Sequence, residues 1–262
     1  MNHKTNPVQA IVLAAGKGTR LNCKELPKVM LPIAGIPMID YSLDNLNKAG
    51  FLKPVVVVGF CGEKIKEHLG SKVIYAEQPR RLGTAHAVMS AEAKVPKNVE
   101  DVVVVMGDDS AFYNPDTITE LVDLHREKSP SITMLTVQKN DPTGLGRVIR
   151  DETGHVTGIV EEKLARSAEK KIKEINAACY VFKTSFLWPA LKKIKRNPTG
   201  EYFLTDLIEI AHHEGRRVIA HKINASQWKG VNTPEQLQLA HKAMISKLKK
   251  NGLVAPEFKP AT

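Results

Sequence analysis

Apolar and polar positions along the chain follow two alternating patterns. Short runs rich in valine and isoleucine recur through the first half of the sequence, and helix-length amphipathic stretches separate them. In the stretch 37–48, Ile39, Leu43 and Leu46 recur at helical spacing, and Gly50 supplies a stop signal. Strands that alternate with helices are typical of a mostly parallel sheet covered by helices. The pattern therefore predicts an α/β fold.

The same pattern assigns the individual elements. It predicts strands at residues 8–13, 55–58, 72–75, 101–106 and 131–138, and helices at 37–48, 63–69, 84–93 and 114–128. After residue 138 the segments 147–150 and 155–160 flank the turn sequence Asp151-Glu-Thr-Gly154, which predicts an antiparallel hairpin and a second lobe. Further strands are expected at 175–182 and 217–223, and helices at 186–194 and 202–213. Thr233-Pro-Glu-Gln236 reads as a capping box that starts a last helix ending near 249.

Composition narrows the class of protein. A chain of 262 residues with 42% hydrophobic and 25% charged residues is one large or two small globular domains, which excludes general disorder. Its three widely spaced cysteines suit neither a disulfide framework nor a zinc site, and they favour a reducing compartment. No apolar run has the length of a membrane span or of a signal peptide, so we expect a cytoplasmic protein without membrane partners.

The net charge of +10 is compatible with nucleic acid, an acidic membrane surface or a small anionic substrate. Only 5% of the residues are aromatic, no zinc-finger or RNP-like run is present, and the basic residues are scattered along the chain. These features argue against a nucleic-acid partner. The net charge alone does not separate an acidic membrane surface from a small anionic substrate, so support has to come from where the basic residues lie in the chain.

A glycine loop supplies that support. Leu13-Ala-Ala-Gly16-Lys-Gly18-Thr19-Arg20 follows the first predicted strand directly, where open α/β sheets bind ligands. Glycines there let backbone N–H groups approach phosphate oxygens, and Arg20 and Lys28 can neutralise the charge. The Rossmann pattern fails because Leu21 stands where the third glycine should be, and the Walker A pattern fails because Gly18 follows the lysine. A tight strand-to-helix turn is the alternative interpretation of such a loop alone.

A second candidate is the carboxylate at the end of the strand 101–106. Gly107-Asp108 places a carboxylate at the tip of this strand, where it can hold Mg²⁺ with oxygen ligands. A turn or helix cap is the alternative. Asp109 is a further carboxylate to which the sequence assigns no role.

Several motifs in a fixed order resemble those of a known family. The glycine loop with Pro27-Lys28 and Gly35-Ile-Pro37 resembles the signature of the sugar nucleotidyltransferases. Within that family the chain most resembles the uridyltransferases that make UDP-N-acetylglucosamine, over about residues 8–239. The later motifs that carry this resemblance are Glu77-Gln78, Leu82-Gly83-Thr84-Ala85-His86-Ala87, Asp141-Pro-Thr-Gly144-Leu-Gly146-Arg147-Val148, Gly158-Ile-Val-Glu161, Glu174-Ile-Asn176, Glu201-Tyr-Phe-Leu-Thr-Asp206 and Gly230-Val231-Asn232.

The resemblance implies a site and a fold. It implies a Rossmann-like, mostly parallel sheet with a smaller, β-rich, sugar-binding lobe, the nucleotide-diphospho-sugar transferase fold. It places the catalytic role on Arg20, Lys28 and Asp108, and Mg²⁺ on Asp108 and Asn232. The sugar phosphate is expected at Gly146, Glu161 and Asn176. The nucleotide is expected at Leu13, Ala14, Ala15, Gly16, Gly18, Thr19, Gln78, Gly83 and Thr84.

The implied reaction joins UTP and N-acetylglucosamine 1-phosphate to give UDP-N-acetylglucosamine and pyrophosphate, by Mg-assisted in-line attack on the α-phosphorus. We expect a catalytic domain at 1–232 and a C-terminal helix and tail at 233–262, with either a single activity or an acetyltransferase domain that the chain does not include. One departure bears on the sugar: the family reads Asn-Thr-Gly where this chain has Asn176-Ala177-Ala178. A UTP- or dTTP-dependent hexose-1-phosphate enzyme and a catalytically silent sensor of sugar nucleotides stay as alternatives.

Overall fold

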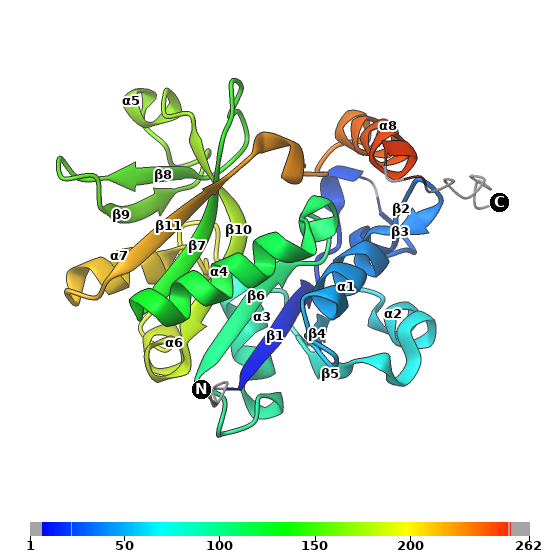
Figure 1. The fold of residues 1–262 in the computed structure, drawn as a ribbon, viewed down its shortest axis with the longest axis horizontal. Helices are drawn as coiled ribbons and strands as arrows, with labels where there is room; N and C mark the ends of the chain where they lie inside the picture. The colour runs from blue at the N-terminus through cyan, green and yellow to red at the C-terminus, as the bar shows by residue number, and fades with distance from the viewer. Residues whose placement is uncertain (1–6, 22, 251, 253–262) are drawn as a thin grey trace.

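One mixed sheet organises the molecule (Figure 1). The computed structural model describes residues 7–21, 23–250 and 252. Within these residues nine strands form this sheet, and seven of them follow the order β11-β7-β10-β6-β1-β4-β5. Their bounds are β1 Val8–Ala14, β4 Val55–Val58, β5 Ile74–Glu77, β6 Asp101–Met106, β7 Ile132–Gln138, β10 Glu174–Lys183 and β11 Val218–Ile223.

The strands at the centre of the sheet pair in parallel, and most of their residues are apolar. β1 pairs in parallel with both β6 and β4, and β4 pairs in parallel with β5. Strands buried on both faces read as continuous apolar runs rather than alternating ones, and Val55–Val58 is buried throughout. β10 is antiparallel to both of its neighbours, β6 and β7, so its N-terminal end lies at the carboxyl edge of β6. This reversal brings the start of β10 to the edge where the glycine loop lies.

Helices cover both faces of the sheet. One apolar cluster joins one face of the sheet to α1, α2 and α4, and another joins the opposite face to α3, α6 and α7. Figure 1 shows α1 and α4 in front of the strands. The helix bounds are α1 Met38–Lys48, α2 Gly62–Leu69, α3 Thr84–Ala91, α4 Pro115–Lys128, α6 Thr184–Leu191 and α7 Asp206–His213. The α/β class and the fold expected from the sequence are confirmed.

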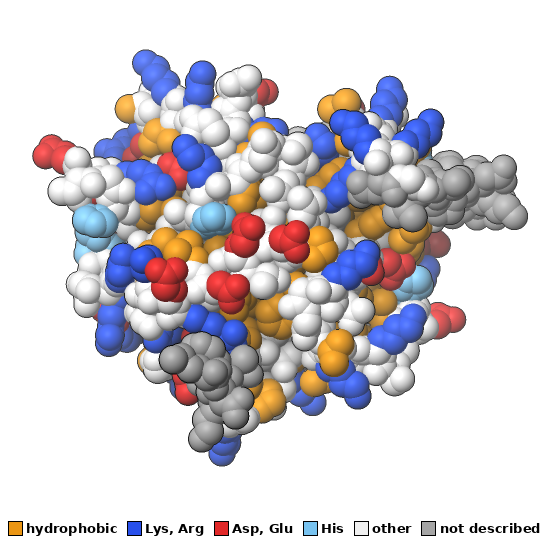
Figure 2. Space-filling model, in the orientation of Figure 1, with side chains coloured by type: hydrophobic (Ala, Val, Ile, Leu, Met, Phe, Trp, Pro, Cys, Tyr) orange, Lys and Arg blue, Asp and Glu red, His pale blue; other side chains and the backbone are white. Residues whose placement is uncertain are grey.

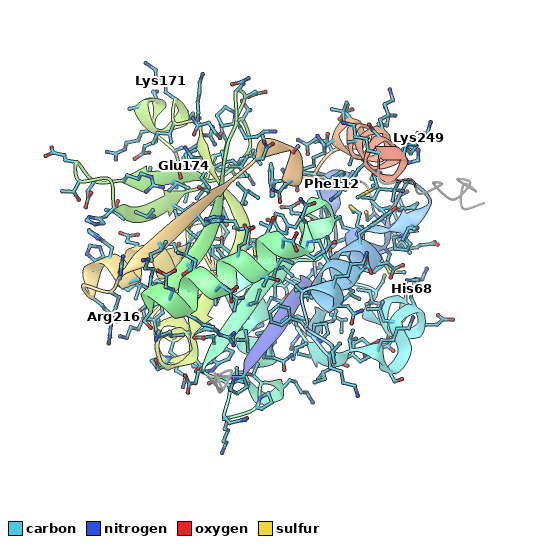
Figure 3. All side chains as sticks on the ribbon, viewed as in Figure 1. His68, Phe112, Lys171, Glu174, Arg216 and Lys249 are labelled. Atoms are coloured by element: carbon cyan, nitrogen blue, oxygen red, sulfur yellow. The ribbon has the colours of Figure 1, made fainter. Side chains whose placement is uncertain are left out.

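The second lobe is a hairpin attached to the start of β10. β8 (Arg147–Arg150) and β9 (Val156–Val160) pair antiparallel, and the short helix α5 (Ser167–Lys170) follows them. Arg150 joins the lobe to β10 through two hydrogen bonds, of 2.8 and 2.7 Å, to the carboxylate of Glu174. Figure 3 shows Glu174 beside the strands of this lobe. Arg147 is buried and forms an ion pair with Glu162 at 2.6 Å.

The last helix packs on the part of the molecule that follows the glycine loop in the chain. α8 (Pro234–Lys250) lies against the two-stranded hairpin of β2 (Pro32–Ile33) and β3 (Ile36–Pro37), with Ala240 and Met244 in a third apolar cluster. Lys247 on this helix donates a hydrogen bond of 2.9 Å to the carbonyl oxygen of Phe112, which Figure 3 places next to α8. The domain division at residue 232 stays a prediction.

Three element predictions need correction. The predicted strand 72–75 is β5 at Ile74–Glu77, because residues 70–72 form a 3-10 turn. The predicted helix 202–213 begins only at Asp206, because backbone hydrogen bonds tie Tyr202 to Leu82 and Ala85 instead. The predicted helix 186–194 is α6, which is shifted toward the N-terminus and ends at Leu191. The other predicted elements are confirmed to within about two residues, whereas α5 and the β2–β3 hairpin were not predicted.

The surface shows how the excess charge is distributed. On the face in Figure 2, Lys and Arg side chains are scattered over the second lobe and α8, and a group of acidic side chains over α4 interrupts them. This face therefore carries no continuous basic stripe. None of the helices in the described part of the chain is long and apolar enough to cross a membrane. All three cysteines are free, as expected.

Candidate active site

The expected site residues gather at the carboxyl edge of the sheet. The glycine loop follows β1, Asp108 follows β6, and Gln78 follows β5, and these three strands run in the same direction. A cavity of about 600 Å³ opens there. Eleven of the predicted residues line it: Leu13, Ala15, Gly16, Gly18, Thr19, Arg20, Lys28, Gln78, Gly83, Thr84 and Asp108.

Ala14 is the predicted nucleotide-binding residue that does not line this cavity. Side chains alternate between the two faces of a strand, so Ala14 lies on the face opposite to Leu13 and Ala15. It is buried in the apolar cluster under α1 and α4. Its side chain is therefore a core group, and only its backbone is available for binding.

The glycine loop needs glycine at one position for steric reasons. Gly18 has a φ of +71°, and a Cβ there would lie 2.8 Å from the Cβ of Lys28. A side chain would thus be strained and would displace Lys28. Gly16 has open space around it, where a ligand can approach the backbone. The loop combines a tight turn with close access, as phosphate binding requires.

The predicted base-reading segment is fixed by its neighbours. The amide nitrogen of Gln78, which is buried, donates a hydrogen bond of 2.9 Å to the carbonyl oxygen of Gly83. Gly83 has a φ of +98°, and a Cβ there would lie 2.8 Å from the backbone nitrogen of Tyr202 and closer still to its carbonyl oxygen. Tyr202 also donates from its N–H to Leu82 and accepts from Ala85. These bonds preform one wall of the cavity.

Lys28 lies at the centre of a charged cluster. Its ammonium forms an ion pair with the Oδ2 atom of Asp108 and donates to the Oδ1 atom of Asn232 at 3.0 Å. Arg20 donates to the same Asn232 oxygen at 2.9 Å. Asn232 lies just before α8, and its backbone N–H donates to the Gln236 side chain at 2.7 Å. The structure therefore brings the four predicted residues from distant parts of the chain to one point.

Burial shapes the ionisation of this cluster. Burial alone would lower the pKa of Lys28, but the charges of Asp108 and Asp109 outweigh it and hold the pKa above its usual value. Burial, and then the charge of Asp108, raises the pKa of Asp109. One oxygen of Asp109 is buried without a hydrogen-bond partner in the structure. Lys28 is thus a firmly protonated cation beside two carboxyl groups.

The same oxygens suit a divalent cation. Asp108 Oδ2 and Asn232 Oδ1 converge on the Lys28 ammonium, so both already face one positive charge. Carboxylate and carboxamide oxygens are the ligands that Mg²⁺ takes, with water and substrate phosphates completing its shell. Among the described residues, no three His, Cys, Asp or Glu side chains cluster as a metal site. The donor set fits magnesium.

The predicted sugar-binding residues form a second cluster at the second lobe. The backbone N–H of Asn176 donates to the carbonyl oxygen of Gly146 at 3.0 Å, and a Cβ on Gly146 would lie 3.3 Å from the Oε1 atom of Glu161. Burial, and then the nearby charge of Asp206, raises the pKa of Glu161. The structure therefore brings these three residues together, although they do not line the cavity of the glycine loop.

A bulge in β10 holds Asn176. Its side-chain nitrogen donates to the Tyr180 hydroxyl at 2.6 Å, and its side-chain oxygen accepts from the backbone of Ala178 at 3.0 Å. The pairing with β7 shifts register between Asn176 and Tyr180, and Ala178 has a φ of +56°. That region of φ favours glycine, which explains why the family's pattern has glycine at this position.

Two basic residues at the cavity were not assigned from the sequence. Lys17 and Arg81 both line it, together with Glu201 and Phe203. Lys17 stands inside the glycine loop, and Arg81 stands between Gln78 and Gly83 in the chain. The one sequence feature that could have identified them is that each stands between residues already assigned to the site.

Comparison with known proteins agrees with this geometry, an α/β sheet whose carboxyl edge carries a glycine loop and a cluster of basic and acidic side chains. The family model described as nucleotidyl transferase matches residues 9–247. The chain therefore belongs to the nucleotidyl transferase family.

Curated relatives share a large part of the sequence. The bifunctional protein GlmU of Heliobacterium modesticaldum is 42% identical over 94% of this chain and 54% of its own length. The bifunctional protein GlmU of Enterococcus faecalis is 42% identical over 91% of this chain and 52% of its own. The chain thus spans about half the length of the curated relatives it matches.

A solved structure supports the fold alone. The structure of a putative glucose-1-phosphate thymidylyltransferase from Bacillus anthracis, in complex with a sucrose, superimposes with a TM-score of 0.75. It covers 90% of this chain and 94% of its own, at 22% identity.

Proposed function

We propose that this chain transfers a uridylyl group from UTP to N-acetylglucosamine 1-phosphate, giving UDP-N-acetylglucosamine and pyrophosphate. The observation that carries the proposal is the convergence of Arg20, Lys28, Asp108 and Asn232 at the mouth of the glycine loop. The similarity to proteins named GlmU over more than nine tenths of the chain supports this substrate pair.

The bond changes are simple. A phosphate oxygen of the sugar 1-phosphate attacks the α-phosphorus of UTP in line, and the bond from that phosphorus to the β-phosphate oxygen breaks. The nucleophile is already an anion, so no general base is needed. Catalysis consists of bringing two anions together and stabilising the charge of the transition state.

The cations of the chain meet this requirement. Lys28 is assigned to the α-phosphate, because its protonated ammonium lies at the centre of the cluster. Arg20, on the exposed side of the loop, is assigned to the departing pyrophosphate. When bound, Mg²⁺ would neutralise phosphate charge, held by Asp108 and Asn232.

We assign recognition of the base to the segment that holds Gln78, and recognition of the sugar to the residues at the second lobe. Because the amide nitrogen of Gln78 is committed to Gly83, its Oε1 atom is presented as an acceptor for the N3–H of uracil. Glu161 and Asn176 supply polar groups for the amino sugar at the second lobe. We further propose that the protein works in the cytoplasm and has no membrane or nucleic-acid partner.

A pyrophosphate-release assay tests the proposal. Four nucleoside triphosphates are crossed with glucose, N-acetylglucosamine and galactose 1-phosphates in the presence of Mg²⁺, and the Lys28→Ala variant serves as the blank. We expect the highest kcat/KM with UTP and N-acetylglucosamine 1-phosphate.

Two results would contradict the proposal and favour another function. A preference for dTTP with glucose 1-phosphate would favour a hexose-1-phosphate enzyme. No pyrophosphate with any pair, although UTP binds, would favour a silent sensor of sugar nucleotides.

A further inference from the structure

Two basic side chains flank one aromatic ring at the edge of the nucleotide cavity. The ammonium of Lys17 lies 5.2 Å from the centroid of the Phe60 ring, and the guanidinium carbon of Arg81 lies 5.5 Å from it. Both residues line the cavity. Arg81 also lines a neighbouring cavity of about 580 Å³ that includes Phe60 and Arg80. Arg81 therefore stands on the boundary between the two.

The position of the ring is fixed by the strand end. Phe60 follows β4 closely, and its N–H donates to the carbonyl oxygen of Ala15 at 3.2 Å. Gly59 permits this approach, because a Cβ there would lie 2.9 Å from the Cβ of Ala15. The ring is thus held against the backbone of the glycine loop.

The two cations lack counter-ions in the structure. Within the described residues, neither Lys17 nor Arg81 has a carboxylate at ion-pair distance, whereas nearby Lys66 has Glu63 at 2.9 Å and Glu77 at 2.7 Å. A cation over a half-buried aromatic ring at the protein surface is held weakly, so an anion can draw it away.

We propose that Arg81 binds the outer phosphates of the nucleoside triphosphate, with Phe60 holding it beside Lys17 when no nucleotide is bound. This inference rests on the proposed function. The segments on either side locate the ligand: Gln78 and Gly83 face the base, and Lys17 belongs to the loop that faces the phosphates.

The negative charge of the triphosphate explains why a further cation such as Arg81 is needed. Lys28, assigned to the α-phosphate, already contacts Asp108 and Asn232, and Arg20, the one cation assigned so far to the departing pyrophosphate, already donates to Asn232. The β- and γ-phosphates carry most of the charge of UTP and require further cations. The planar fork of an arginine binds phosphate oxygens in pairs, which a single ammonium does not.

Binding measured without turnover tests this inference. Isothermal titration of the full chain with UTP and with UMP, in the absence of sugar phosphate, separates the outer phosphates from the rest of the ligand. We expect Arg81→Gln to weaken UTP binding about tenfold and to leave UMP binding unchanged, as for the loss of one charged hydrogen-bonding group. The loss should shrink as salt is raised.

Arg80→Gln is the matched control. Arg80 is the exposed neighbour of Arg81 that lines only the second cavity, so its variant should bind both nucleotides normally. Arg81→Lys should recover part of the affinity for UTP.

Three results would overturn the inference, and they are distinguishable. Normal UTP binding by Arg81→Gln would show that Arg81 does not contact the outer phosphates. Equal weakening of UTP and UMP would place Arg81 at the base, ribose or α-phosphate. A wild-type chain that neither binds UTP nor releases pyrophosphate would remove the proposed function and this inference together.

Discussion

The half of the site assigned to the nucleotide carries, besides the paired Lys28, cations that are exposed or half-exposed, whereas the half assigned to the sugar is fixed by internal hydrogen bonds. Lys17, Arg20 and Arg81 line the cavity without carboxylate partners among the described residues. At the second lobe, by contrast, Asn176 has both side-chain atoms bonded, and buried Arg147 is paired with Glu162. Surface charges can adjust to a flexible, strongly charged triphosphate, whereas preformed bonds favour discrimination of a neutral ring.

The largest expected effect is a loss of turnover when a cation of the nucleotide half is removed. Lys28→Ala removes the ammonium assigned to the α-phosphate, so we expect kcat to fall by about 10²- to 10³-fold, with a much smaller change in KM for the sugar phosphate. Steady-state pyrophosphate release measures both constants. Lys24→Ala, an exposed lysine of the same loop, is the control and should keep normal rates. Weakened binding of both substrates at normal turnover would contradict the role of Lys28.

A smaller effect is expected in the sugar half. Tyr180→Phe removes the hydroxyl that accepts from Asn176 at 2.6 Å, which leaves a part-buried amide without its partner. We expect KM for the sugar phosphate to rise about tenfold, with KM for UTP unchanged.

Phe182→Leu is the control for Tyr180. Phe182 stacks on the Tyr180 ring at 5.4 Å between centroids but is not bonded to Asn176. Its variant should lose stability without a selective change in KM. A similar rise in both Michaelis constants for Tyr180→Phe would mean that the bond only stabilises the fold.

The two halves also differ in how far the sequence predicts them. The nucleotide loop is continuous in sequence and follows a strand, so Gly16, Gly18 and Arg20 are recognisable from local pattern and strand-end geometry. Gly146, Glu161 and Asn176 come from three separate segments, and no periodicity connects them. Their grouping was predicted only through resemblance to a family.

Tertiary contacts explain most of the remaining differences. The helical pattern of α7 continues back to Tyr202, but the backbone of Tyr202 is hydrogen-bonded to Leu82 and Ala85 and lies outside the helix. Such pairing is invisible to local propensity. Arg81 was not assigned because a single arginine in a loop has no distinguishing pattern, and only the position of Phe60 gives it a role. The sheet itself was predictable, because its central buried strands β4 and β6 are runs of valine that only Asp101 and Met106 flank.

The carboxyl groups of the sugar half predict a pH effect on stability. Burial, and then the charge of Glu209, raises the pKa of Asp206 to about 6. An acid with a raised pKa binds more protons when folded, so stability falls as the pH rises from near 4 to above 6. Asp206→Asn should remove this slope and increase the free energy of unfolding at pH 7 by about 1 kcal/mol, after allowing for solvent screening of a half-buried group.

Urea titrations at pH 4 and pH 7 measure this difference. Glu214→Gln is a suitable control, since Glu214 is paired with Lys193 at 2.7 Å and lies outside the cluster. An unchanged slope in Asp206→Asn would show that Asp206 is ionised normally. If the carboxylate serves the sugar, the stabilised variant will also bind sugar phosphate less well, which is the usual cost of a destabilised site.

The smallest effect concerns the backbone of the bulge that holds Asn176. Ala178 has a φ of +56°, a conformation that costs a non-glycine residue about 1–2 kcal/mol, while glycine would lose part of that gain through greater freedom when unfolded. Ala178→Gly should therefore increase the free energy of unfolding by up to about 1 kcal/mol. Ala177→Gly, at a fully buried strand position without a positive φ, should instead decrease it. Because the sugar half is set by bonds rather than by this strain, Ala178→Gly should leave KM for the sugar phosphate within about twofold of the wild-type value. A large rise in that KM would show that the strained alanine itself shapes the sugar site, and the contrast between a rigid sugar half and an adaptable nucleotide half would then rest on one backbone angle.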